Sequence, residues 1–90
     1  MEFSKDELIK VTNAVVLKDN GKSKLYNIST DTRTIKENDI YLPLQGENFD
    51  GEKFIDSDGI NAYFTTGDNI TSRADFVLKV KDTKKAYINI

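Results

Sequence analysis

Two short polar stretches hold most of the side chains in this sequence that could bind a polar ligand. The first is Ser29-Thr30-Asp31-Thr32-Arg33-Thr34, with five hydroxyl or carboxylate side chains and one guanidinium in six residues. Such groups can hydrogen-bond a ligand, but Asx and ST turns use the same groups to close the backbone on itself. Both interpretations stay open, and in the second Asp31 and Arg33 bridge each other or cap a neighbouring element.

The second stretch is Gly46-Glu47-Asn48-Phe49-Asp50-Gly51. Its two glycines expose backbone N–H groups and allow a ligand to approach the main chain closely. Uracil requires an adjacent donor and acceptor, which the Asn48 amide or one peptide unit provides, and an aromatic face such as Phe49 can stack on a base. In the alternative interpretation the glycines serve turns and Phe49 belongs to the core. The stretch is not a P-loop, because Glu52-Lys53 follows where Lys-Ser/Thr would be required.

Composition removes several classes of function. The chain of 90 residues contains neither His nor Cys, so the commonest general acid/base, the commonest metal ligand and all thiolate chemistry are missing. Thirteen basic and fifteen acidic side chains are interspersed, so we expect no nucleic-acid surface. No apolar run approaches the ~20 residues of a membrane span, and the absence of Cys fits a reducing cytoplasm. The carboxylates Asp50, Asp56 and Asp58 lack the spacing of an EF-hand loop, and we expect no metal site.

The N-terminal elements are marked by local signals. Ser4 and Glu7 form the pattern of a capping box, which predicts a helix from Lys5 to about Thr12. An apolar run at residues 14–17 is followed by Asn20-Gly21, the strongest short hairpin signal, so we expect a hairpin whose second strand covers residues 25–28.

The remaining elements alternate between strands and short helices. Pro43 has no backbone N–H to donate to a neighbouring strand. The strand at 40–44 is therefore expected at a sheet edge, or with the nitrogen of residue 43 facing outward. The other expected elements are a helical turn or two at 52–57, strands at 61–66 and 75–80, and a helix over 84–90 begun by Asp82-Thr83. The pattern predicts one α/β or α+β domain, a small mixed sheet flanked by short helices.

Three segments in order resemble the N-terminal domain shared by the MurE and MurF members of the Mur ligase family. They are Ile28 to Ile35 with its Asp-Thr-Arg turn, Asn38-Asp39-Ile40-Tyr41-Leu42-Pro43-Leu44, and Gly46-Glu47-Asn48-Phe49-Asp50-Gly51 followed by Phe54. The resemblance covers about residues 28–80, and the residues of the third segment look more like those of MurF than those of MurE. It implies an α/β fold of the MurE/MurF N-terminal type.

The resemblance also implies a function. Residues 1–82 would form a domain that binds the UDP end of UDP-N-acetylmuramoyl-peptide, and 83–90 would begin the helix leading to a central ATP-binding domain. The parent enzyme would be a cytoplasmic peptidoglycan-precursor ligase that adds D-Ala-D-Ala with ATP and Mg²⁺, using its own central and C-terminal domains. These ninety residues would not be catalytic by themselves and would need no cofactor. Alternatives are a MurE-type ligase that adds the third amino acid, and a stand-alone binding or scaffold domain.

By position, the resemblance places uridine contacts at Thr30 and Thr32, with Asp31 and Arg33 holding the turn between them. Gly46, Glu47, Asn48 and Phe49 would contact the uracil. The sequence departs from the family pattern at two places: Asn38 replaces a Gly, and Glu52-Lys53 replaces His-Asp. We interpret the change at Glu52-Lys53 as a surface change without effect on nucleotide recognition. The helix after Phe54 is expected to be a stub.

Overall fold

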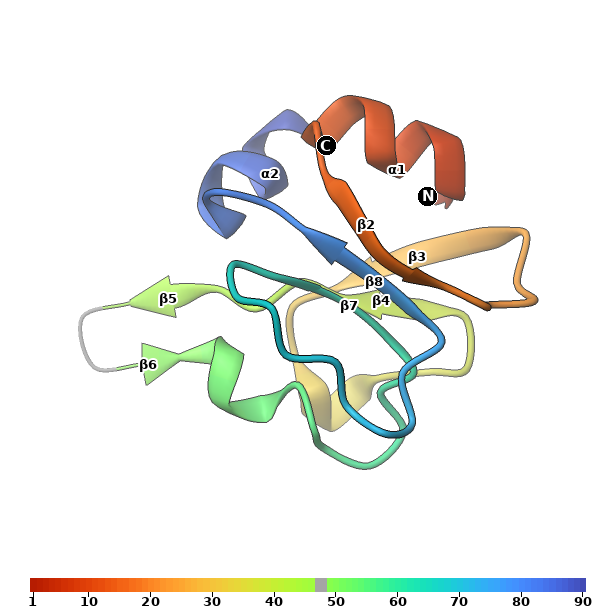
Figure 1. Cartoon of the computed structure of the whole chain (residues 1–90). Coiled ribbons are helices and arrows are strands. Elements are labelled where there is room, and N and C mark those ends of the chain that lie inside the picture. Colours follow the sequence, from red (N-terminus) through yellow and green to blue (C-terminus); the bar gives the residue numbers. More distant parts are fainter. Residues whose placement is uncertain (47–48) are drawn as a thin grey trace.

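The described part of the domain has a mixed six-stranded sheet with two α-helices on one face and two 3-10 turns on the other, and a separate two-stranded ribbon (Figure 1). The computed structural model describes residues 1–46 and 49–90. The elements are β1 (Glu2–Ser4), α1 (Lys5–Thr12), β2 (Val15–Asp19), β3 (Leu25–Ser29), η1 (Thr32–Thr34), β4 (Asp39–Tyr41), β5 (Gln45–Gly46), β6 (Phe49–Asp50), η2 (Gly51–Phe54), β7 (Ala62–Thr65), β8 (Phe76–Lys79) and α2 (Thr83–Asn89). The predicted α/β class with a small mixed sheet and short helices is confirmed.

The strand order of the sheet is β1-β3-β4-β7-β8-β2. The four central strands β3, β4, β7 and β8 run parallel to one another, and β1 and β2 pair antiparallel at the two edges. The predicted hairpin at Asn20-Gly21 is therefore wrong, since β2 pairs with β8 and not with β3. Both edges of β3 are taken by β1 and β4, and the backbone N–H of Asn20 donates to the Asp75 carbonyl at 2.6 Å, beside β8.

Alternating side chains along the central strands fill two separate cores. On the helix-covered face, buried residues from the strands meet Leu8 of α1 and Ala86 of α2. On the opposite face, Tyr41, Tyr63 and Val77 stand at matching register positions of β4, β7 and β8. Because the parallel strands are covered on both sides, β7 is buried along its whole length.

Both α-helices begin as the sequence predicts. In α1 the Ser4 hydroxyl accepts from the Glu7 N–H and the Glu7 carboxylate accepts from the Ser4 N–H, which completes the capping box. Asn13 ends α1 in the left-handed conformation at φ 55°, a role that Asn tolerates. The Asp82 carboxylate caps α2 by accepting from the N–H groups of Lys84 and Lys85.

Two expectations about the middle of the chain need correction. Of the two placements expected for the strand at 40–44, the sheet edge is wrong, because β4 is central. β4 ends at Tyr41, so the Pro43 nitrogen, which carries no hydrogen, lies beyond the strand. The stretch expected as a loop between Gly46 and Gly51 includes a two-stranded ribbon, in which Gln45 pairs with Asp50 and Gly46 with Phe49. The helix after this ribbon is a stub, as expected: η2 has four residues.

Candidate functional site

A pocket of about 540 Å³ lies where β3 and β4 end. Its lining residues are Thr30, Asp31, Thr32, Arg33, Tyr41 and Phe54. The first four follow β3, Tyr41 is the last residue of β4, and Phe54 is the last residue of η2. Since β3 and β4 are parallel, their carboxyl ends meet at one edge of the sheet, where ligands of open α/β sheets bind.

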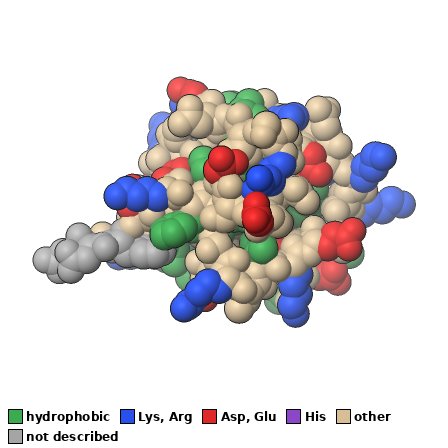
Figure 2. Space-filling model, turned by 90° about the horizontal axis from the view of Figure 1, so that it is seen from below, with side chains coloured by type: hydrophobic (Ala, Val, Ile, Leu, Met, Phe, Trp, Pro, Cys, Tyr) green, Lys and Arg blue, Asp and Glu red, His purple; other side chains and the backbone are tan. Residues whose placement is uncertain are grey.

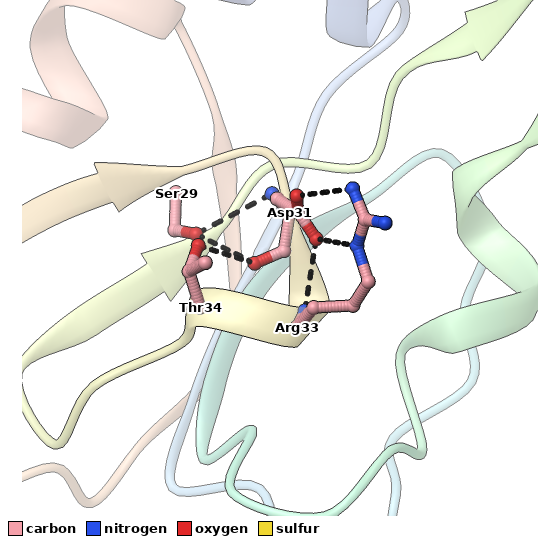
Figure 3. Close-up of polar contacts among 4 residues, drawn as sticks. All are labelled: Ser29, Asp31, Arg33 and Thr34. Atoms are coloured by element: carbon pink, nitrogen blue, oxygen red, sulfur yellow. Dashed lines mark hydrogen bonds and ion pairs between the residues drawn. The ribbon is translucent and has the colours of Figure 1, made fainter.

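The polar wall of the pocket is a closed turn built around Asp31 (Figure 3). The Asp31 carboxylate accepts from the backbone N–H, Nε and Nη2 of Arg33, at 2.9, 3.0 and 2.9 Å. The Asp31 carbonyl accepts from the hydroxyls of Ser29 at 3.1 Å and Thr34 at 3.3 Å. These bonds engage Asp31 within the turn, so its carboxylate holds the segment between the two pocket-lining threonines, Thr30 and Thr32.

The ion pair in this turn changes the acidity of both partners. Hydrogen bonds from the Arg33 side chain, and next from its backbone, hold the pKa of the Asp31 carboxyl below its ordinary value. The same pairing raises the pKa of Arg33. The guanidinium is largely exposed, so its contribution to stability is small, although its bidentate geometry fixes the turn.

Replacing Arg33 with glutamine is expected to raise the Asp31 pKa toward its ordinary value. A group whose pKa is lowered by folding stabilises the fold above its unfolded pKa, and that contribution disappears as the pH falls through the folded pKa. The measurement is the carboxyl carbon shift of Asp31 followed by NMR between pH 2 and 6. An unchanged Asp31 midpoint in the variant would contradict the pairing.

The opposite wall of the pocket depends on a close backbone contact at Gly51. The Gly51 N–H donates to the Leu44 carbonyl at 2.9 Å, and the Gly51 carbonyl accepts from the buried Tyr41 hydroxyl at 2.9 Å. Burial, and then the charges of Glu52, Asp31 and Asp50, raise the pKa of Tyr41, so it remains a neutral donor at physiological pH. This contact fixes the start of η2 against β4 and directs the chain toward Phe54, a lining residue that is 41% exposed.

The structure brings together only part of the predicted site. Thr30, Asp31, Thr32 and Arg33 all line the pocket. Gly46 lies exposed in β5, outside the pocket lining, while Glu47, Asn48 and the side chain of Phe49 lie outside the described residues. The two aromatic residues of the pocket, Tyr41 and Phe54, were not among the predicted contacts. The signals available for them were the position of Tyr41 at the end of a strand and the match of Phe54 to an aromatic of the family pattern.

The surface around this end of the molecule carries mixed charges. Seen from below, Lys and Arg side chains alternate with Asp and Glu, and hydrophobic side chains stand between them (Figure 2). Within residues 1–46 and 49–90, no three or more carboxylates come together as a metal site would require. In the same ranges, neither α-helix has the length and apolar character of a membrane span.

The sequence is similar to curated ligases of peptidoglycan-precursor synthesis, although no family model matches it. It is 41% identical over 51 residues to the UDP-N-acetylmuramoyl-L-alanyl-D-glutamate–2,6-diaminopimelate ligase of Clostridium tetani, covering 57% of this chain and 10% of the relative. With the same enzyme of Clostridium perfringens it shares 34% identity over 83 residues, 88% of this chain and 17% of the relative. With the UDP-N-acetylmuramoyl-tripeptide–D-alanyl-D-alanine ligase of a Synechocystis species it shares 50% identity over 32 residues, 36% of this chain and 7% of the relative.

The fold matches one part of a solved ligase. A crystal structure of MurF from Acinetobacter baumannii superimposes with a TM-score of 0.82 at 24% identity, over 99% of this chain and 20% of that chain. The chain thus spans less than a fifth of the length of the curated relatives described above. By sequence the chain is similar to MurE and MurF ligases, and its fold is that of the MurF N-terminal domain.

Proposed function

We propose that the pocket between η1 and η2 binds the uridine end of a UDP-N-acetylmuramoyl-peptide. The observation that carries this proposal is the composition of the pocket: a polar turn, Thr30 to Arg33, faces the two aromatic residues Tyr41 and Phe54 at the carboxyl ends of parallel strands. In support, the curated relatives are by name ligases of UDP-N-acetylmuramoyl compounds.

The chemistry of the two walls suits a nucleoside. The exposed ring of Phe54 offers an apolar face on which a flat base can stack. The hydroxyls of Thr30 and Thr32 each donate and accept, as the ribose and the edge of uracil require. Asp31 neutralises Arg33, the one cation among the described lining residues. Most of the affinity should therefore come from base and ribose rather than from the diphosphate. Gly46, Glu47, Asn48 and Phe49 remain proposed contacts to the uracil on the family resemblance alone.

For the whole protein we infer a cytoplasmic ligase that uses ATP and Mg²⁺ on a central domain and adds D-Ala-D-Ala to the tripeptide precursor. The MurF match over 99% of the chain favours this assignment. The match to a diaminopimelate ligase over 88% of the chain supports a second candidate, addition of the third amino acid. Assaying the full-length enzyme with D-Ala-D-Ala and with diaminopimelate separates the two candidates. A coding sequence with no Gly-Lys-Thr/Ser motif after the Ile90 codon would instead favour a scaffold domain.

UDP is expected to shift the amide resonances of Thr30 to Arg33 and of Phe54 together, with a Kd of about 1 mM for the isolated domain, equivalent to about −4 kcal/mol. Replacing Thr32 with valine keeps the shape of the side chain and removes its hydroxyl. Loss of one ligand hydrogen bond worth about 0.5–1.5 kcal/mol should weaken binding by about 2- to 10-fold. The measurement is a titration followed by two-dimensional NMR.

Thr12 provides the matched control, because its hydroxyl donates to the Leu8 carbonyl within α1, far from the pocket lining. Thr12→Val should leave the Kd for UDP unchanged. CDP, whose base reverses the donor and acceptor pattern of uracil at N3 and at the 4-substituent, should bind more weakly than UDP. If millimolar UDP moves none of these resonances while the domain is folded, the uridine assignment is wrong and a scaffold role is favoured.

A further inference from the structure

The carboxylate of Glu52, the second residue of η2, is bound to the exit of β7. Its Oε2 accepts from the Thr65 hydroxyl at 2.9 Å. Its Oε1 accepts from the backbone N–H of Thr66 at 2.6 Å and from the Thr66 hydroxyl at 3.2 Å. Both carboxylate oxygens are thus used, and the three donors come from the last residue of β7 and the residue that follows it.

These bonds join a charged acceptor to neutral donors on one buried residue, Thr65, and one exposed residue, Thr66. Thr65 is 1% exposed, and its hydroxyl also accepts from the Gly67 N–H at 3.0 Å. Hydrogen bonds to an ionised carboxylate are roughly twice as strong as bonds between neutral groups. The negative charge of Glu52 also contributes, after burial, to the raised pKa of Tyr41, a lining residue of the pocket.

The geometry of η2 links this attachment to the pocket. A 3-10 helix has about three residues per turn, so side chains two positions apart point in different directions. Glu52 therefore reaches β7 while Phe54 lines the pocket from the same short element. The start of η2 is held separately, by the Gly51 contacts with Leu44 and Tyr41. The Gly51 contacts thus hold η2 to Leu44 and β4, and the Glu52 carboxylate connects η2 to β7.

We propose that Glu52 is a positioning residue of the nucleotide pocket, which fixes the Phe54 ring by tying η2 to the carboxyl end of β7. This inference rests on the proposed uridine site. It replaces the interpretation of position 52 as a surface change without effect on recognition. The two walls of the pocket come from separate segments, η1 and η2. Glu52 joins η2 to the central sheet.

A double-mutant cycle between Glu52 and Phe54 tests the proposal. Phe54→Ala removes the stacking face and is expected to weaken UDP binding by about 5-fold or more. Glu52→Ala should weaken binding by a similar factor, because the ring loses its fixed place. The double variant should bind no more weakly than Phe54→Ala alone, since a residue that acts through Phe54 has nothing left to position. Glu52→Gln retains the side-chain length and one carbonyl acceptor and should bind within about 2-fold of the original chain.

The control is Lys53→Ala, because Lys53 is exposed, lies between the two test positions and does not line the pocket. It should leave binding unchanged. All variants are first checked for folding by their amide spectra, and the Phe54 ring resonances are recorded without ligand.

The outcomes separate the two proposals. Unchanged UDP binding in Glu52→Ala, or a loss that multiplies with that of Phe54→Ala, would overturn the positioning role. If the unmodified chain binds no UDP, the proposed function is wrong. The Phe54 ring resonances, recorded without ligand, then test the positioning role of Glu52 by themselves. Ring shifts that change in Glu52→Ala but not in Lys53→Ala then support positioning, and identical ring shifts in all three proteins contradict it.

Discussion

Replacing Phe76 with alanine is expected to lower the free energy of unfolding by about 3–5 kcal/mol, the cost of removing a fully buried aromatic ring from a core. Phe76 is 0% exposed at the start of β8. Its ring stacks on Tyr26 with centroids 5.2 Å apart and planes at 28°, and the Lys5 ammonium lies 5.2 Å from its centroid. A single substitution would thus disturb β8, β3 and α1 together.

For a domain of this size, such a loss equals a Tm lower by at least about 12 °C. It also removes a large part of a total stability that is on the order of 5–13 kcal/mol. Thermal unfolding followed by circular dichroism measures it. Phe54→Ala is the matched control, because it removes the same ring from a residue that is 41% exposed, and its effect on Tm should be far smaller. Equal effects at the two positions would show that burial of Phe76 does not dominate.

Replacing Gly51 with alanine is expected to destabilise the fold by about 1–3 kcal/mol and to displace η2 from the sheet. A Cβ at this position would lie 2.8 Å from both the N and the O of Leu44 and 2.9 Å from the Cα of Pro43. These are backbone atoms next to β4, so they cannot rotate away as a flexible side chain would. The Gly51 bonds to Leu44 and Tyr41 would lengthen, and the pocket wall that carries Phe54 would move.

Gly67 offers the control for this substitution. A Cβ there would meet only the Thr65 hydroxyl oxygen at 3.7 Å, an ordinary contact, so Gly67→Ala should leave stability within about 0.5 kcal/mol. Urea unfolding of the two variants gives the comparison, and UDP titration reports the pocket. A Gly51→Ala protein as stable as Gly67→Ala would mean that the backbone between Leu44 and Gly51 is not held as closely as the structure shows.

Local sequence determined the elements whose signals involve near neighbours. The Ser4 and Glu7 capping box specifies the beginning of α1, because both of its hydrogen bonds lie within one turn. The apolar runs at 61–66 and 75–80 mark β7 and β8, since buried parallel strands need apolar side chains on both faces. The Asp31 turn also follows from nearby residues, because a carboxylate two positions before an arginine can bond its backbone and its side chain.

Strand partners and the composition of the pocket were decided only in the tertiary structure. Asn20-Gly21 has the local chemistry of a hairpin, yet Gly21 is not in the positive-φ region and β2 pairs with β8. The hairpin would require an edge of β3 that β1 and β4 already occupy. Pocket composition depends in the same way on distant segments: Phe54 faces the Asp31 turn because Gly51 packs on Leu44 and Glu52 bonds to Thr65 and Thr66. Contacts over 7 to 14 positions leave no periodic signal in the sequence, so only the folded sheet brings these residues together.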